Sequence, residues 1–264
     1  MRNNLVSVII PTYNSANYVK EAVDSVLGQT YKNIGVIVVD DGSTDNTKSI
    51  LEKYIKSGEI KYIYQDNNGP ASARNNGIKK SSGEFIAFLD ADDVWLPNKL
   101  EKQIKLFENN DVGLVYSDME FFGGKFKYRH HSEVLKREMF RGYVYGKLIF
   151  ENFIPTSSIV VRRDVLDDIG LFDEDRELFA IEDYDLWLRI TRRYKVDFVN
   201  KLLVKYRIHK DKISGSRKRS YYGLCEIYKK EFLRTSFLYK PMILLRYVTS
   251  FIKYLIASIF YGNS

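Results

Sequence analysis

A cluster of carboxylates follows the apolar segment Phe85–Leu89, where Asp90, Asp92 and Asp93 stand close together. Such groups at the end of a buried strand repel one another unless a cation or solvent relieves the repulsion. Hard oxygen ligands suit Mg²⁺ or Mn²⁺, and these ions commonly bridge to substrate phosphates. The simpler interpretation is a solvated turn in which Asp93 caps the next helix.

A second acidic pair, Asp40-Asp41, follows the apolar segment Val36–Val39 and weakens the simple-turn interpretation. Two other signals are weak by themselves. Small residues around Arg74 permit a close backbone approach, and its guanidinium can face an anion. Asp183 stands near the expected start of a helix, where an acidic side chain usually just complements the helix dipole.

Strand-like and helix-like segments alternate over the first 120 residues. The expected strands are apolar runs at positions 5–10, 36–39, 60–64, 85–89 and 112–117. Apolar residues at helical spacing separate them, and one such helix is expected over Pro97–Asn109. The alternation predicts an α/β fold with a mostly parallel sheet and helices on both faces. Such sheets bind ligands beyond the carboxyl ends of their strands, which is where the acidic pairs fall.

Composition excludes several classes of protein. The 264 residues, 45% of them hydrophobic, suffice for about one large domain or two small ones. The single cysteine, Cys225, excludes an internal disulfide framework and fits a reducing compartment. The start of the chain lacks the pattern of a signal peptide. Neither G-x-G-x-x-G nor G-x-x-x-x-G-K-[ST] occurs, which disfavours dinucleotide oxidoreductases and P-loop NTPases.

The net charge of +7 is concentrated in the last quarter of the chain. Residues 1–120 hold 13 basic and 17 acidic side chains, and residues 121–200 hold 14 of each. Residues 201–264 hold 14 basic and 3 acidic side chains, a net charge of +11. This distribution disfavours a nucleic-acid partner and favours contact with an anionic membrane surface or phosphorylated ligands.

Taken together, five segments closely resemble the family 2 glycosyltransferases of the GT-A fold. In chain order they are Val8–Asn14, Val39–Asp45, Ala73–Asn75, Gly83–Asp93 and Glu182–Arg189. The resemblance covers residues 5 to about 215, and five motifs in order are very specific. It implies a Rossmann-like α/β fold and an inverting transferase that uses a nucleotide-diphosphate sugar, most commonly a UDP sugar, and Mn²⁺ or Mg²⁺.

The resemblance also implies which residues bind the donor. The loop against the nucleoside corresponds to Pro11, Thr12, Tyr13 and Asn14. Asp41 matches the carboxylate that bonds the base, and Arg74 falls where the family contacts the nucleotide. Asp90 and Ala91 open the D-x-D segment, near the ribose or the sugar.

The remaining implied roles are metal binding and proton transfer. Asp92 corresponds to the direct metal ligand, and His209 falls where some members place a further metal or pyrophosphate contact. Asp183 resembles the catalytic base. Chemistry supports this division, because a divalent ion stabilises the leaving diphosphate while a carboxylate across the donor takes the acceptor proton.

The chain is expected to contain one GT-A domain and an extension. Residues 1–120 form the nucleotide-sugar-binding half, 121–215 the acceptor-binding and catalytic-base half, and 216–264 a basic, apolar helical extension. Within 241–261 a single polar stripe is formed by Arg246, Thr249, Ser250 and Lys253. Its two cations disfavour a spanning helix and favour a helix in the membrane interface. The alternative is a packed core helix or a homodimer seam.

These expectations converge on a glycosyltransferase at the cytoplasmic face of the cell membrane. It would add one sugar to a growing cell-surface glycan whose acceptor is carried on a polyprenyl lipid. One alternative is direct transfer to polyprenyl phosphate. Another is a non-catalytic nucleotide-sugar-binding subunit, which the intact acidic motifs disfavour.

Overall fold

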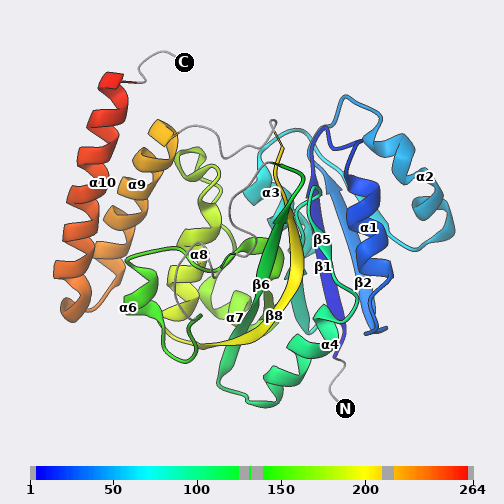
Figure 1. The fold of residues 1–264 in the computed structure, drawn as a ribbon, viewed down its shortest axis with the longest axis horizontal. Coiled ribbons are helices and arrows are strands. Elements are labelled where there is room, and N and C mark those ends of the chain that lie inside the picture. Colours follow the sequence, from blue (N-terminus) through cyan, green and yellow to red (C-terminus); the bar gives the residue numbers. More distant parts are fainter. Residues whose placement is uncertain (1–3, 125–130, 132–138, 210–216, 261–264) are drawn as a thin grey trace.

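The computed structural model describes residues 4–124, 131, 139–209 and 217–260, and in this part of the chain one eight-stranded mixed sheet forms the centre (Figure 1). The strand order is β3-β2-β1-β4-β7-β6-β8-β5. The strands are β1 (Val6–Thr12), β2 (Ile34–Asp40), β3 (Lys61–Tyr64), β4 (Phe85–Phe88), β5 (Val94–Trp95), β6 (Val112–Phe122), β7 (Val160–Arg162) and β8 (Lys195–Arg207).

Helices connect the strands and continue beyond the last one. The α-helices are α1 (Val19–Leu27), α2 (Thr47–Ser57), α3 (Pro70–Lys79), α4 (Lys99–Ile104), α6 (Tyr145–Leu148), α7 (Arg163–Ile169), α8 (Glu182–Thr191), α9 (Arg217–Arg234) and α10 (Lys240–Phe260). The 3₁₀ turns are η1 (Lys105–Glu108), η2 (Thr156–Ser158), η3 (Arg176–Leu178) and η5 (Phe237–Tyr239). The helix expected over Pro97–Asn109 is therefore shorter and ends in η1.

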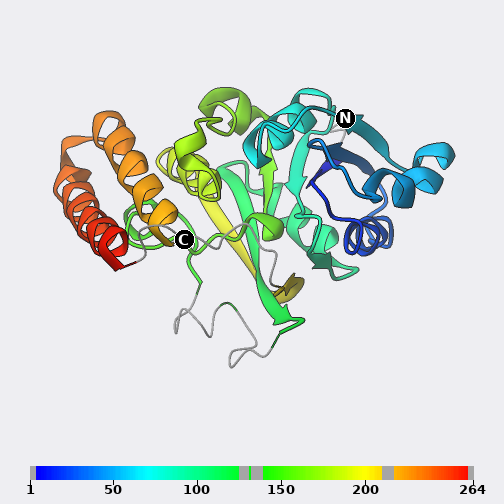
Figure 2. The same ribbon diagram turned by 90° about the horizontal axis from the view of Figure 1, so that it is seen from above.

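Helices cover both faces of the sheet, as Figure 2 shows from above. Alternate residues of β1 enter different cores: Val8 packs with side chains of α1, α2 and α4, whereas Ile9 packs with those of α3 and α8. This alternation follows from the two-residue period of a strand. Burial on both faces explains why the strands appear as continuous apolar runs in the sequence.

The first four strands in the sheet confirm the predicted parallel arrangement. β3, β2, β1 and β4 all run parallel, and Thr12 at the end of β1 lies beside Asp40 at the end of β2. The loops after these strands therefore meet at one edge of the sheet.

The other half of the sheet departs from that pattern. β7 lies between β4 and β6 and runs antiparallel to both, while β6 and β8 are parallel and β5 pairs antiparallel with β8. β7 spans only three residues, whereas β8 is long and continues through Lys205 to Arg207. Because β7 runs in the opposite direction, the turn η2 before it lies at the edge where β4 ends.

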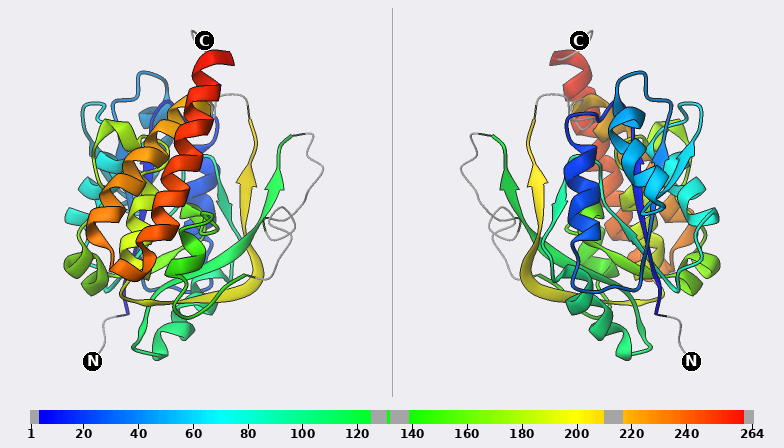
Figure 3. Two further views of the ribbon diagram at one scale, coloured as in Figure 1. Left: turned by 90° about the vertical axis from the view of Figure 1, so that its left-hand side faces the viewer. Right: turned by 90° about the vertical axis from the view of Figure 1, so that its right-hand side faces the viewer.

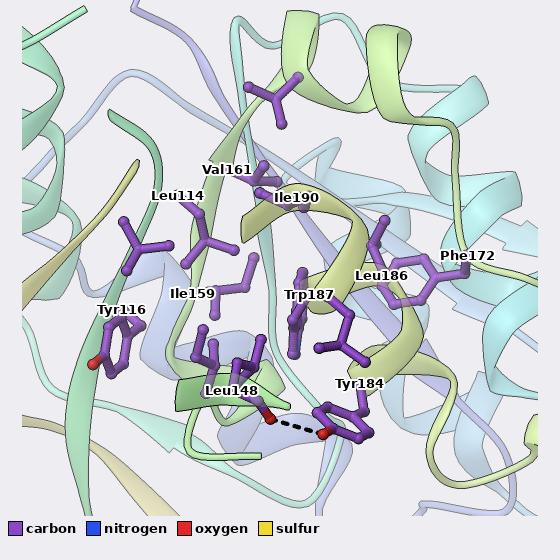
Figure 4. Close-up of a cluster of buried hydrophobic side chains, with 14 of the residues drawn as sticks. Leu114, Tyr116, Leu148, Ile159, Val161, Phe172, Tyr184, Leu186, Trp187 and Ile190 are labelled. Atoms are coloured by element: carbon purple, nitrogen blue, oxygen red, sulfur yellow. Dashed lines mark hydrogen bonds between the residues drawn. The ribbon is translucent and has the colours of Figure 1, made fainter. Parts of the chain in front are cut away.

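A large apolar cluster fixes α8 against the sheet (Figure 4). Trp187 is fully buried there between the strands and α6. The Tyr184 hydroxyl donates a 2.7 Å hydrogen bond to the carbonyl oxygen of Leu148, the dashed line in Figure 4. The amino-terminal end of α8, which carries Glu182 and Asp183, is therefore held in a fixed position.

The last two helices form a hairpin at the end of the molecule remote from α1 and α2 (Figures 1 and 3). The polar stripe of α10 faces α9: Ser250 is buried, Arg246 lies over the ring of Tyr228, and Lys253 over the ring of Tyr221. The opposite face is exposed and apolar, formed by Leu244, Leu245, Val248, Phe251, Ile252, Leu255, Ile256 and Ile259. We call these residues the α10 apolar face.

Among the described residues, the segment Phe237–Ile259 is long and apolar enough to cross a membrane, judged by length and composition alone. Its mean hydropathy is 1.5, and only 17% of it is buried within the structure. A helix in the core of a soluble protein is mostly buried. The low burial of α10 therefore disfavours the alternative that it is a packed core helix.

A buried guanidinium joins the two halves of the domain. Arg74 on α3 is 6% exposed and donates through Nη1 to Glu182 at 2.5 Å and through Nη2 to Asp90 at 2.9 Å. Glu182 begins α8, and Asp90 follows β4. α3 can lie this close to β1 because Gly77 has no side chain. A Cβ at this position would lie only 2.5 Å from the side chain of Ile9. We call Arg74, Glu182 and Asp90 the arginine clamp.

Removal of the clamp cation is expected to destabilise the protein strongly. In Arg74→Met, Glu182 would be left charged and uncompensated in the interior, which typically costs about 3–5 kcal/mol. Urea unfolding at pH 7.5 measures the loss. The control is Arg193→Met, because Arg193 pairs with Asp168 at an exposed site where a pair contributes about 1 kcal/mol or less. Adding Glu182→Gln to Arg74→Met should restore part of the loss, and equal losses for Arg74→Met and Arg193→Met would contradict the clamp.

Candidate active site

One cavity of about 960 Å³ opens at the carboxyl edge of the sheet. All the residues that the sequence analysis assigned to the site line this cavity: Pro11, Thr12, Tyr13, Asn14, Asp41, Arg74, Asp90, Ala91, Asp92, Asp183 and His209. They come from the ends of β1, β2, β4 and β8 and from the starts of α3 and α8. The structure therefore brings together segments that are up to 198 residues apart in the sequence.

The loop after β1 is tied to the loop after β2. The backbone of Asn14 donates to Ser43 Oγ at 2.9 Å, and its side-chain oxygen accepts from the backbone of Thr44 at 2.8 Å. Asn14 has a positive φ of 47°, a conformation that asparagine tolerates better than most residues. The tie fixes the backbone while the neighbouring Tyr13 stays 46% exposed at the cavity wall.

Asp41 organises the loop that leads into α3. Its carboxylate accepts hydrogen bonds from the Gln65 side chain at 2.8 Å, the Asn68 backbone at 2.9 Å and the Gly69 backbone at 2.8 Å. Gly69 has a φ of +88°, which favours glycine at this position. These bonds use three of the roughly four acceptor positions of a carboxylate. One position remains for a hydrogen-bond donor in the cavity.

Asp93, the last of the three carboxylates after β4, has a structural role. Asp93 is fully buried and accepts hydrogen bonds from Ser157 Oγ at 2.6 Å and from the backbone of Arg207 at 3.0 Å. It does not cap the next helix, because α4 begins only at Lys99. Asp93 instead anchors the end of β8 beside the loop, which is how His209 reaches the cavity.

Asp92 and His209 face each other at the cavity. The Oδ2 atom of Asp92 lies 2.8 Å from Nε2 of His209, and both side chains are partly exposed. The ring of Tyr18 packs against the imidazole with a centroid separation of 4.7 Å. No sequence motif supports a role for the neighbouring pair His130 and His131. His131 lines the same cavity, whereas His130 lies outside the described residues.

The Asp92–His209 pair can supply only two ligands to a divalent ion. The described residues contain no group of three or more histidine, cysteine or acidic side chains placed to hold a metal by themselves. Ions of the Mg²⁺ type often take only one or two protein ligands and complete their shell with substrate phosphates and water. The carboxylate of Asp92 suits Mg²⁺ or Mn²⁺, whereas an imidazole is a ligand more typical of the later transition metals. The pair therefore fits a metal that is shared with a diphosphate.

Asp183 is partly buried and held through both carboxylate oxygens. Thr156 Oγ1 donates to Oδ2 at 2.7 Å, and the backbone of Tyr184 donates to Oδ1 at 2.7 Å. Burial and, secondarily, the charge of Glu182 raise the pKa of Asp183 to about 6, although Thr156 and Arg74 favour its anion. A carboxylate with this pKa can accept a proton at neutral pH.

Sequence reasoning missed several residues that hold the site together. Thr156, Ser157 and Asp93 contact residues that are distant in the sequence, and nothing in the short run Thr156–Ser158 signals such contacts. Thr12 Oγ1 and Glu182 Oε2 are among the buried polar atoms that have no hydrogen-bond partner within the described part of the chain. Both residues line the cavity, so a bound ligand can satisfy these atoms.

Comparisons with known proteins identify the family. An uncharacterised glycosyltransferase of Rickettsia typhi is 40% identical over 214 residues, covering 78% of this chain and 64% of that protein. The chain thus spans less than two thirds of that relative. The Escherichia coli UDP-Glc:alpha-D-GlcNAc-diphosphoundecaprenol beta-1,3-glucosyltransferase WfgD is 34% identical over 221 residues, 82% of each chain.

The fold is also similar to that of solved structures. The crystal structure of S. aureus TarS 1-349 in complex with UDP-GlcNAc superposes with a TM-score of 0.76 at 21% identity, covering 98% of this chain and 76% of that one. This likeness confirms the expected GT-A architecture. The family model described as Glycosyl transferase family 2 matches residues 7–170, which is more than half of the chain. The chain therefore belongs to glycosyl transferase family 2.

Proposed function

We propose that the protein is a metal-dependent, inverting glycosyltransferase that moves a sugar from a nucleotide-diphosphate sugar to a hydroxyl of a lipid-linked cell-surface glycan. One observation carries the proposal: the Asp92–His209 pair and the separately held Asp183 line a single cavity. The first fits a diphosphate-bound Mn²⁺ or Mg²⁺, and the second fits a base. The donor and acceptor in the name of the relative WfgD support a UDP sugar and a polyprenyl-diphosphate-linked acceptor.

The donor half of the site comprises the loops after β1, β2 and β4. The loop Pro11–Asn14 and the remaining acceptor position of Asp41 suit a nucleoside, and Asp90 with Ala91 suits the ribose or sugar. Arg74 was expected to contact the nucleotide. Glu182 and Asp90 bind its terminal nitrogens, so we also assign it to the positioning of Asp90. Its Nε atom has no hydrogen-bond partner in the described part of the chain, which leaves the proposed nucleotide contact open to it.

The proton of the acceptor hydroxyl is assigned to Asp183. As the hydroxyl oxygen attacks the anomeric carbon, the bond from that carbon to the diphosphate breaks and Asp183 accepts the proton. A divalent ion at Asp92 and His209, when bound, neutralises charge on the diphosphate. In this scheme residues 1–120 serve mainly the donor, residues 121–215 the acceptor and base, and residues 216–264 the membrane.

We place the protein at the cytoplasmic face of the cell membrane. The α10 apolar face supports attachment to a membrane, with the helix lying in the plane of the interface. To cross the membrane, α10 would have to leave α9 and carry Arg246 and Lys253 into hydrocarbon. A central cation costs about 2.5–3.5 kcal/mol even on the lower of the measured scales. Lying flat keeps both cations against α9 and presents the aliphatic side chains to lipid. The net charge of +11 in residues 201–264 suits anionic headgroups.

Replacement of the base should abolish transfer while donor binding persists. Asp183→Asn should lower transfer at least about 10²-fold, because general-base catalysis typically contributes that much. The wild-type rate should rise about tenfold per pH unit below pH 6 and level off above it, since the anion is the active form. Donors are chosen by screening nucleotide sugars with Mn²⁺ for thermal stabilisation or slow hydrolysis. Asp167→Asn, an exposed site on α7, is the control, and near-normal turnover of Asp183→Asn would sink the assignment.

Asp183→Asn should also change how the free energy of unfolding depends on pH. The pKa of Asp183 is raised above its ordinary 3.8 to about 6 in the folded protein. Between about pH 4 and 6 the native protein therefore keeps a proton on Asp183 that the unfolded chain has already released. Wild-type stability therefore falls as the pH rises through 6. Asp183→Asn lacks this loss and should gain roughly 1 kcal/mol relative to wild type between pH 5 and pH 8.

Asp92→Asn should abolish Mn²⁺-dependent binding of UDP and leave the fold intact. The substitution removes a negative charge from the metal-facing oxygen, and the side chain is partly exposed, so little packing is lost. Calorimetric titration of UDP with and without Mn²⁺ measures the effect, and Asp167→Asn again serves as the control. Unchanged Mn²⁺-dependent binding in Asp92→Asn would refute Asp92 as the metal ligand.

Acidic substitutions on the α10 apolar face should release the protein from membranes. Val248→Glu with Ile252→Glu alters only exposed side chains, so the melting temperature should stay near that of wild type. Flotation with vesicles containing anionic lipid should be lost, whereas Tyr64→Glu, at an exposed site on β3, should float normally. A homodimer seam predicts another result: the double variant would change the oligomeric state in the absence of lipid and would float as wild type does.

A further inference from the structure

The turn η2 contacts both parts of the proposed site through neighbouring hydroxyl groups. Thr156 is 7% exposed and Ser157 is 2% exposed, so both hydroxyls are largely shielded from water. Thr156 Oγ1 donates to the Oδ2 atom of Asp183 at 2.7 Å. The Thr156 contact orients the carboxylate that the proposed mechanism uses as the base.

Ser157 contacts the donor loop instead. Its Oγ accepts a hydrogen bond from the backbone of Asp90 at 3.2 Å and donates to Asp93 at 2.6 Å. The Ser157 carbonyl oxygen in turn accepts from the indole of Trp95 at 2.7 Å. The loop that carries Asp92 is thus held from both ends by one serine.

The strand order explains how one turn reaches both sites. Ala87 in β4 pairs with Val160 in β7, and the two strands are antiparallel. The residues before Val160 therefore run alongside the residues after β4, toward the carboxyl edge of the sheet. A parallel strand at this position would place its preceding turn at the opposite edge, away from the cavity.

We propose that Thr156 and Ser157 are positioning residues that hold the Asp90–Asp93 loop and the carboxylate of Asp183 in a fixed position relative to each other. The inference rests on the proposed function, because it takes Asp183 as the base and the Asp90–Asp93 loop as part of the donor site. Each hydroxyl serves one half: Thr156 orients Asp183, and Ser157 orients the loop. Their adjacency in a short turn keeps the separation between the two halves constant.

The charged groups around Asp183 make the two roles separable by pH. Glu182 on the same helix disfavours its anion, whereas Arg74 on α3 and the Thr156 hydroxyl favour it. Loss of the Thr156 hydroxyl should therefore shift proton transfer toward higher pH. Loss of the Ser157 hydroxyl leaves all three of these groups in place and should not.

Thr156→Val removes the hydroxyl at nearly constant volume. We expect kcat for the donor selected by the screen to fall about tenfold at pH 7, with KM for the donor within about twofold of wild type. The acid limb of the pH–rate profile should move up by about one unit, since a hydrogen bond to a charged group is of that order. Thr156→Ser retains the hydroxyl and should restore both kcat and the profile.

Ser157→Ala should show the complementary result. UDP binding with Mn²⁺, measured by calorimetry, should weaken about tenfold while the acid limb stays in place. A wild-type profile in Thr156→Val, or a failure of Thr156→Ser to restore it, would overturn the inference. So would a Ser157→Ala variant with an unchanged UDP affinity. Melting curves of each variant identify losses that come from unfolding alone.

The Asp183→Asn variant separates this inference from the proposed function. If Asp183→Asn turns over normally, Asp183 is not the base and both ideas fall. If Asp183→Asn is inactive while Thr156→Val has wild-type kcat and pH dependence, the base assignment stands and only the positioning role is refuted.

Discussion

The structure depends on the burial of one guanidinium between two carboxylates. Arg74 joins α3 to the start of α8 and to the end of β4, which are the elements that carry Glu182 and Asp90. Without this cation Glu182 would lie uncompensated in the interior, and its neighbour Asp183 would be driven further toward the neutral acid. The clamp thus holds α3, α8 and the end of β4 together, and its charges contribute, after burial, to the pKa of the residue assigned as the base.

Because β7 runs antiparallel to β4, the turn η2 that precedes β7 lies at the carboxyl edge of the sheet. In a wholly parallel sheet that turn would lie at the opposite edge. Parallel strands bring Thr12, Asp41 and Asp90 to one edge through their carboxyl ends, but that edge then needs support from outside those loops. β7 supplies it with its preceding turn, and α8 supplies the carboxylates of Glu182 and Asp183 through its amino-terminal end. β7 and α8 therefore contribute to the site through residues at or before their amino-terminal ends. β1, β2 and β4 contribute through the loops that follow their carboxyl ends.

The sequence predicted the parts of the site that depend on local pattern. Asp41, Asp90 and Asp92 follow apolar strands, so their common edge could be inferred from strand direction, and the resemblance to a known family added Asp183 and His209. The rest depends on contacts between distant segments. Arg74 and Glu182 are 108 residues apart, and Ser157 and Asp93 are 64 apart, so no local period reports their pairing. The long strand β8 was missed because exposed and buried residues vary irregularly along it.

The direction in which α10 faces also lay beyond the sequence, although its stripe was visible. A stripe containing Arg246 and Lys253 suggests a side turned to water, yet these residues lie over tyrosine rings of α9. α9 is joined in turn to α8, where Arg234 pairs with Asp185 at 2.8 Å and the hydroxyls of Tyr228 and Tyr184 lie 3.2 Å apart. The helix that presents the α10 apolar face and the helix that carries Asp183 in its first turn are therefore connected through a single intermediate helix. If the α10 apolar face lies on a membrane as proposed, this connection holds Asp183 at a defined distance from the surface that carries a lipid-linked acceptor.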